Sequence, residues 1–158
     1  MSEDDLGGIE IPDDLSGLTA AQPPTVAVVV TQVAVAEALA AACSLAGVDV
    51  DAVPSPVGAL AVLRDPGAGV SAAGAVSTLL RQVPVVLLER REGKVSASQW
   101  VAGAHQKDLP AGLVLSGAPE VLEELLLGDL PAADVEGAVP SVGMSRWKAM
   151  RLLAAHRR

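Results

Sequence analysis

The sequence predicts an α/β fold with a doubly wound, mostly parallel open sheet of four or five strands. The first observation is that apolar, β-branched segments alternate with segments of helical spacing between residues 25 and 128, which is typical of βαβ units. The second is composition, because 51% of the 158 residues are hydrophobic, enough for the core of one domain. Phe and Tyr are absent. The core must therefore consist of Val, Leu and Ala, which pack well between a parallel sheet and its helices.

The first unit is predicted to be strand, helix, strand. The segment 25–30 (TVAVVV) is an uninterrupted apolar run, 33–47 (VAVAEALAAACSLAG) has helical spacing, and 48–53 (VDVDAV) alternates like a strand. In an open α/β sheet, ligands bind beyond the carboxyl ends of the strands. There the first strand is followed by Thr31 and Gln32, neutral side chains where a magnesium site would require carboxylates.

The next stretch allows two interpretations. We favour a strand over 58–63 (GALAVL), followed by a glycine-rich loop over 65–69 and a helix over 70–82. A helix over 55–65 (SPVGALAVLRD) is the alternative. The connection that precedes this strand is too short for a parallel crossover, which needs a dozen or more residues. Either the second strand is short, or this local pair is antiparallel.

The rest of the body is predicted to alternate in the same way. Pro119 opens its last helix, acidic residues follow in the first turns, where they favour the helix dipole, and Gly128 ends it. The predicted elements are a strand over 84–89, a charged loop over 90–94, a helix over 95–108, a strand over 111–117 and a helix over 119–128.

Charge is unevenly distributed along the chain. Residues 1–24 carry six acids and no base, which predicts a disordered acidic leader, with Ile9 and Ile11 as a candidate docking motif. Residues 129–143 have the Pro, Gly and Asp content of a linker, and 144–158 carry five bases and no acid. The net charge of −8 argues against a nucleic-acid partner, because neutralising phosphates requires clustered Lys and Arg.

The basic segment 144–158 is predicted to be an amphipathic helix capped by Ser145. Its cationic side chains beside Trp and Met suit the groove of a protein partner, while the acidic body of the same chain is an equal alternative. The helix is too short for stable membrane insertion. The candidate partner-binding residues are Arg146, Trp147, Lys148, Met150, Arg151 and Leu153.

No residues assemble into a catalytic or metal-binding motif, so neither an enzyme nor a cofactor is expected. Cys43 lies among alanines and is predicted to be a buried apolar side chain. His105 has only Asp108 one turn away, and Ser116 lacks the GxSxG context of a hydrolase nucleophile. A single cysteine, no signal peptide and no apolar run of 18 residues predict a cytoplasmic protein.

The predicted elements over about 25–128 include the segments TVAVVV, EALAAACSLAGVDVDAV, VPVVLLE and GLVLSGAPEVLEELL. With these segments, the order of elements resembles a response-regulator receiver domain, which is flavodoxin-like. It is also similar to the atypical receiver domains that precede MinD/ParA-type ATPases in pilus assembly. No GxxxxGK[ST] loop of such an ATPase occurs in the sequence.

The resemblance implies a receiver without its phosphoryl chemistry. Receivers carry an acidic pair after strand one, a phosphoacceptor Asp after strand three, a hydroxyl after strand four and a Lys after strand five. At most one of these four features is retained. The resemblance therefore implies a non-catalytic regulatory or scaffold protein whose partner is an ATPase or a secretion or pilus component. A homodimer is also compatible with this interpretation. The corresponding positions are Thr31-Gln32, Asp65, Glu89-Arg90 and Ser116-Gly117.

The alternative function is a small-ligand or nucleotide-binding module that uses the strand ends and the loop over 65–74. Backbone N–H groups of its glycines suit an anion, but their spacing matches neither the dinucleotide nor the Walker motif. A plain turn Asp before Pro-Gly is the simpler account of Asp65. The candidate ligand-binding residues are Thr31, Gln32, Asp65, Gly67, Gly69, Glu89 and Ser116; no metal ligand is predicted.

Overall fold

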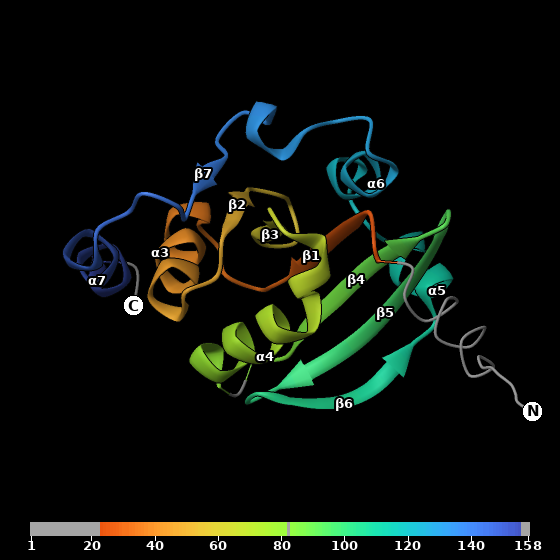
Figure 1. Ribbon diagram of the computed structural model, residues 1–158, viewed down its shortest axis with the longest axis horizontal. Helices are drawn as coiled ribbons and strands as arrows, with labels where there is room; N and C mark the ends of the chain where they lie inside the picture. The colour runs from red at the N-terminus through yellow and green to blue at the C-terminus, as the bar shows by residue number, and fades with distance from the viewer. Residues whose placement is uncertain (1–22, 82, 156–158) are drawn as a thin grey trace, which may run out of the picture.

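Figure 1 shows the computed structural model, which describes residues 23–81 and 83–155. Across these residues seven strands form one sheet in the order β6-β5-β4-β1-β3-β2-β7, and every neighbouring pair is antiparallel. The strands are β1 (Val26–Val30), β2 (Val50–Val53), β3 (Leu60–Leu63), β4 (Val85–Arg91), β5 (Lys94–Val101), β6 (Ala104–Leu109) and β7 (Val139–Pro140). The helices are α3 (Ala36–Ala46), α4 (Gly69–Leu80), α5 (Ala111–Ser116), α6 (Glu120–Leu127) and α7 (Arg146–Ala155), with 3-10 turns η1 (Pro66–Ala68) and η2 (Ala132–Asp134). The predicted acidic leader lies outside the described residues apart from Pro23 and Pro24.

The prediction of a doubly wound, mostly parallel, flavodoxin-like sheet is wrong. Strands β1 and β2 do run parallel and are joined through α3, but β3 lies between them and pairs with both. In the same way α4 joins β3 to β4, and β1 lies between those two strands. The first four strands thus form two interlocked split βαβ units in the order β4-β1-β3-β2, the connectivity called ferredoxin-like. The hairpin β5–β6 extends this sheet at one edge and β7 at the other.

The strand favoured over 58–63 is present as β3, and its short connection from β2 explains the antiparallel sheet. Residues 54–59 are too few to cross over the sheet, so β3 returns beside β2 as a hairpin partner. The alternative helix over 55–65 does not form. The antiparallel option for this local pair is the one that the structure adopts.

Helices cover both faces of the sheet, and each face has its own apolar core. Helices α3 and α4 lie on one face, where Leu39 and Val76 pack against Val29 and Leu87 of the sheet. Helix α6 covers the opposite face, where Val28 belongs to the second core. Consequently β1 is buried on both faces, which requires the continuous apolar sequence that is also typical of a parallel sheet.

The helix predicted over 95–108 is instead the hairpin β5–β6. The loop predicted over 90–94 is shorter than expected, because only Glu92 and Gly93 form the turn between β4 and β5. Both turns have two central residues with positive φ, namely Glu92 (51°) with Gly93 (79°), and Ala102 (52°) with Gly103 (88°). Such turns match the twist of paired strands. The apolar residues whose spacing predicts a helix here lie on both faces of the sheet.

The strand predicted over 111–117 is instead helix α5. Its partly buried side chains follow the i, i+3, i+4, i+7 pattern of a helix face, while Leu113 is 72% exposed. In a run this short, apolar content alone does not separate strand from helix. The residues that pack on the second core are Ala111, Val114, Leu115 and Ala118.

The stretch over 129–143, expected to be a linker, crosses the sheet edge and contains η2 and β7. Strand β7 pairs with β2, and Ser141, only 3% exposed, joins the two segments through its hydroxyl. That hydroxyl donates to the Val48 carbonyl oxygen (2.8 Å) and accepts from the Val50 N–H (2.9 Å). This segment therefore positions α7, which follows it directly.

We expect Ser141→Ala to lower the free energy of unfolding by about 1–3 kcal/mol, because it removes both bonds and leaves the buried Val50 N–H unpaired. Chemical denaturation measures the change. Ser116→Ala is the matched control, since the exposed Ser116 hydroxyl donates only to the Leu113 carbonyl in its own helix. Its effect should stay within about 0.5 kcal/mol. Equal stability of Ser141→Ala and the natural chain would contradict this role.

Candidate functional site

The candidate ligand residues do not converge on one edge of the sheet. Thr31 follows the carboxyl end of β1. Because β3 and β4 run antiparallel to β1, their carboxyl ends lie at the opposite end of the strands. Gln32 is exposed beside Thr31, whereas Asp65 and Glu89 lie at the far edge. The common edge implied by the receiver resemblance is therefore absent from the described sheet.

Thr31 is a structural residue rather than a ligand. Its side chain is only 1% exposed, and its hydroxyl donates to the Ala59 carbonyl oxygen (2.7 Å) and accepts from the Val33 N–H (3.2 Å). The β2–β3 loop lies directly against it. A Cβ at Gly58, which has φ of 125°, would collide with the Thr31 carbonyl oxygen. No room for a ligand is left over Thr31.

Asp65, Gly67, Gly69 and Glu89 do lie close together, where β3 leads into α4. The Asp65 carboxylate accepts from the Gly67 N–H (3.0 Å) and caps η1. A Cβ added at Gly69, the first residue of α4, would lie 2.8 Å from Glu89 Oε2. Glu89 is 8% exposed and its Oε1 lies 3.4 Å from Arg91 Nη1. The carboxylate of Glu89 thus lies beside the first residue of α4, where its negative charge disfavours a bound phosphate.

The neighbouring cavity has the wrong charge for a phosphate. It has a volume of about 170 Å³, and two carboxylates line it, those of Asp49 and Asp65. Its remaining lining is small and mostly apolar: Gly47, Val48, Leu63, Ala68, Ser71 and Ala72. Two carboxylates repel an anion.

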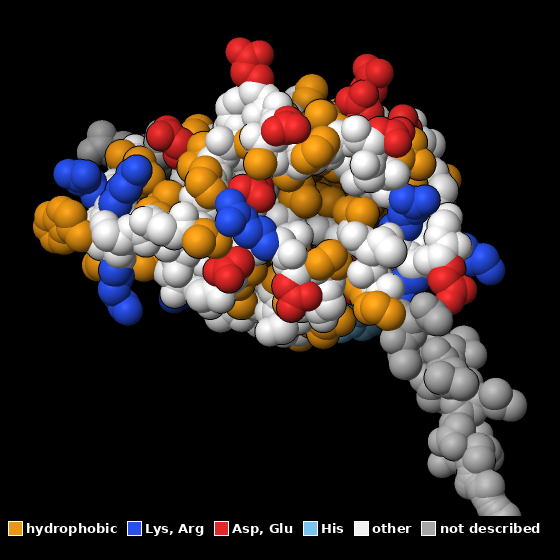
Figure 2. Space-filling view, turned by 45° about the horizontal axis from the view of Figure 1, so that its top comes forward, with side chains coloured by type: hydrophobic (Ala, Val, Ile, Leu, Met, Phe, Trp, Pro, Cys, Tyr) orange, Lys and Arg blue, Asp and Glu red, His pale blue; other side chains and the backbone are white. Residues whose placement is uncertain are grey.

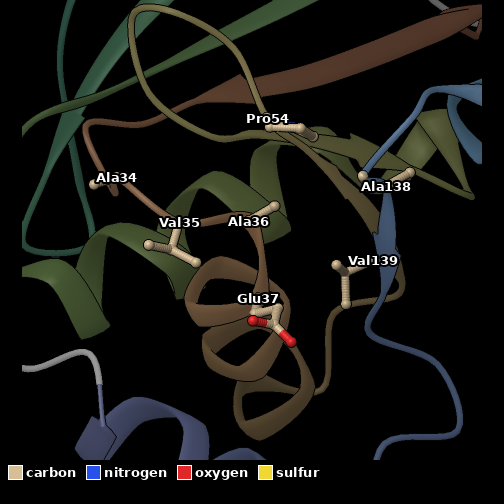
Figure 3. Close-up of a pocket in the computed structure, with 8 residues that line it drawn as sticks. Ala34, Val35, Ala36, Glu37, Pro54, Ala138 and Val139 are labelled. Carbon is tan, nitrogen blue, oxygen red and sulfur yellow. The ribbon is translucent and has the colours of Figure 1, made fainter.

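A larger cavity of about 480 Å³ lies at the start of α3 (Figure 3). Small apolar side chains from α3, the β2–β3 loop and the β7 segment surround it, and Glu37 supplies the only charged group among its lining residues. The first turn of α3 already carries this acid, which complements the helix dipole. The cavity offers few groups that would fix the orientation of a ligand.

We expect millimolar phosphate or ATP to leave the melting temperature unchanged, because the Glu89 carboxylate lies beside the first residue of α4 and two carboxylates line the adjacent cavity. A ligand that binds only the folded state must raise that temperature. Differential scanning fluorimetry in matched chloride and phosphate buffers measures it. A concentration-dependent rise with ATP but not with chloride would contradict the expectation.

The other reactive residues lie apart from these groups. Ser116 is exposed on α5, on the opposite face of the sheet from α4. His105 Nε2 lies 3.0 Å from Asp108 Oδ1, within the exposed strand β6. Arg90 Nη1 donates to the carbonyl oxygens of Leu126 (3.3 Å) and Leu127 (3.0 Å), so it caps the end of α6. Within 23–81 and 83–155, no cluster of three or more His, Cys, Asp or Glu could hold a metal.

Cys43 is fully buried in α3, and desolvation raises the pKa of its thiol to about 12. We expect the native protein to resist the thiol reagent DTNB at pH 8, because a pKa near 12 leaves roughly one thiolate in ten thousand. Absorbance should rise only when denaturant unfolds the chain. Rapid stoichiometric reaction of the folded protein would show that this thiol is accessible.

The predicted basic helix is present as α7, and it packs on α3 (Figure 1). Ala149 is fully buried in the contact, and the Ser44 hydroxyl donates to the Met144 carbonyl oxygen (3.3 Å) just before the helix. The Ser145 hydroxyl accepts from the Lys148 N–H (3.1 Å) and caps the first turn as predicted. Leu153 is half-buried.

The remaining candidate partner-binding residues form what we call the outer face of α7. Trp147 is 73% exposed and Met150 is 53% exposed, although both are large apolar side chains. Figure 2 shows hydrophobic and basic side chains gathered together at this end of the molecule. The outer face comprises Arg146, Trp147, Lys148, Met150 and Arg151. The structure thus brings together five of the six residues that the sequence singles out.

Comparisons with known proteins identify no relative. No family model, curated protein or solved structure matches the chain. In the part of the chain that the structure describes, no helix combines the length and apolar character needed to cross a membrane.

Proposed function

We propose that this protein is a non-catalytic regulatory or scaffold protein that binds a protein partner through the outer face of α7. The observation that supports it best is the exposure of Trp147 and Met150 beside three cationic residues. That the partner is an ATPase or a secretion or pilus component stays a prediction from the receiver resemblance.

Trp147 and Met150 expose large apolar side chains that a partner would bury on binding. Burying such a large apolar side chain contributes about 1.5–3 kcal/mol. Trp and Arg are also the residues most enriched among binding hot spots, and Met adapts to irregular partner surfaces. The outer face therefore combines the side chains that contribute most to association.

The face is also held in position before binding. Ala149 anchors the helix against α3, Ser145 caps its first turn, and the bonds of Ser141 fix the segment that leads into it. A preformed helix pays less ordering entropy on association than a flexible tail. Its cations select an acidic partner and steer the encounter.

We expect Trp147→Ser to weaken partner binding by about tenfold to thirtyfold, which corresponds to the roughly 1.4–2 kcal/mol of a hot-spot residue. The immobilised full chain is used to capture proteins from a lysate. A protein retained by the natural chain and lost with Trp147→Ser is then purified, and its affinity for both chains is measured by calorimetry.

Leu113→Ser is the matched control, since Leu113 is as exposed as Trp147 but lies on α5. It should bind the partner with unchanged affinity. The proposal fails if every captured protein binds Trp147→Ser and the natural chain equally well.

A further inference from the structure

The cations on the outer face of α7 form no ion pair with the described residues. The described ion pairs join Asp51 to Arg64, Glu89 to Arg91 and His105 to Asp108, and none involves α7. The cations of α7 therefore have no acidic partner among residues 23–81 and 83–155. The same chain carries a segment of opposite charge at its other end.

We propose that residues 1–22, which make up the acidic leader without Pro23 and Pro24, dock on the outer face of α7 in cis and compete there with the protein partner. This inference rests on the proposed function, because it names what occupies the same surface in the unbound protein. It makes the leader an autoinhibitory segment.

Charge complementarity is the first argument. The leader has six acids and no base, whereas 144–158 has five bases and no acid. The body between these ends carries 13 acids and only six bases, so it repels the leader and offers it few cationic sites. Three of those six bases, Arg64, Arg90 and Arg91, are engaged in bonds within the body.

The apolar residues of the leader are the second argument. Glu10 lies between Ile9 and Ile11, and Asp13 and Asp14 follow them. An acidic segment with large apolar side chains matches a face on which Trp147 and Met150 stand among cations. Acids alone would be weakly held, because exposed ion pairs contribute only about 0–1 kcal/mol. Burying apolar side chains supplies the larger contribution.

The leader is long enough to reach. It joins the body at Thr25, just before the central strand β1. Its 22 residues span up to roughly 70–80 Å when extended, whereas a domain of this size has a radius of gyration of only about 14 Å. A tether of this kind gives an effective concentration in the millimolar range. A millimolar affinity is therefore sufficient for the leader to cover α7 about half of the time.

Trp147 provides a direct reading of this contact in the full chain. The only other tryptophan, Trp100, is 9% exposed, so acrylamide quenching of fluorescence reports mainly on Trp147. A chain with Trp147→Leu gives the small contribution of Trp100 alone. The probe uses the whole protein and needs no knowledge of the partner.

We expect the triple substitution Glu10→Gln, Asp13→Asn and Asp14→Asn to raise the quenching constant of Trp147. If the leader covers the face half of the time, its release roughly doubles that constant. Sodium chloride at 1 M should produce the same rise in the natural chain, because it reduces the screening length to about 3 Å.

The control neutralises three exposed acids of the body instead, by the substitutions Asp129→Asn, Asp134→Asn and Glu136→Gln. It changes the net charge by the same amount and should leave quenching unchanged. An unchanged quenching constant in the leader variant overturns the proposal, and so does an equal rise in leader and body variants. Shielding that disappears on dilution overturns it as well, because the leader would then dock on a second copy.

The quenching experiment on the leader and the binding experiment on the partner can fail independently. If the leader docks and the partner uses the same face, the leader variant should bind that partner about twofold more tightly, because its binding-competent fraction doubles. If Trp147→Ser loses the partner while the leader variant leaves quenching unchanged, the proposed function stands and the autoinhibition fails.

Discussion

The short connection between β2 and β3 is the constraint on which the rest of the structure depends. With only residues 54–59 available, β3 must turn back beside β2, and Gly58 presses the loop against the Thr31 backbone. Strand β3 then lies between β1 and β2, so α3 must cross over it. The next crossover, α4, spans β1 in the same way. One hairpin thereby converts a βαβ pattern from a parallel sheet into an antiparallel one.

Sequence patterns predicted the helices that bury one face and the strand that is buried on both faces. They failed for segments whose apolar pattern is compatible with either a helix or a strand. Strand β1, helices α3, α4 and α6, and the terminal helix α7 follow from apolar spacing and caps. The order of the strands does not, because β1 is buried on both faces in either type of sheet. For β5–β6, the two X-Gly turns are a stronger signal than the helical spacing, and for α5 the spacing of Ala111, Val114 and Leu115 is the informative signal.

The candidate ligand residues do not all lie together, for a topological reason. Residues that follow successive strands meet at one edge only when those strands are parallel. In this sheet Thr31 and Asp65 follow antiparallel neighbours and lie at opposite edges. The candidate partner site did not depend on strand order. Its residues lie within a single helical segment, so periodicity alone placed Arg146, Trp147 and Met150 together.

Helix α7 is attached to the body by packing, so its cationic side chains are free to face the solvent. An acidic body and a basic helix suggest attachment by ion pairs, but none of the described ion pairs involves α7. Instead α7 packs on α3 with Ala149 fully buried, and the Ser44 hydroxyl donates to the Met144 carbonyl oxygen just before the helix. Small residues allow the two helices to approach closely without using a cation. Packing therefore fixes the helix, while charge stays on its outer side. Because exposed charges act over about 8 Å at physiological ionic strength, the field of these cations reaches into the solvent without loosening α7 from α3.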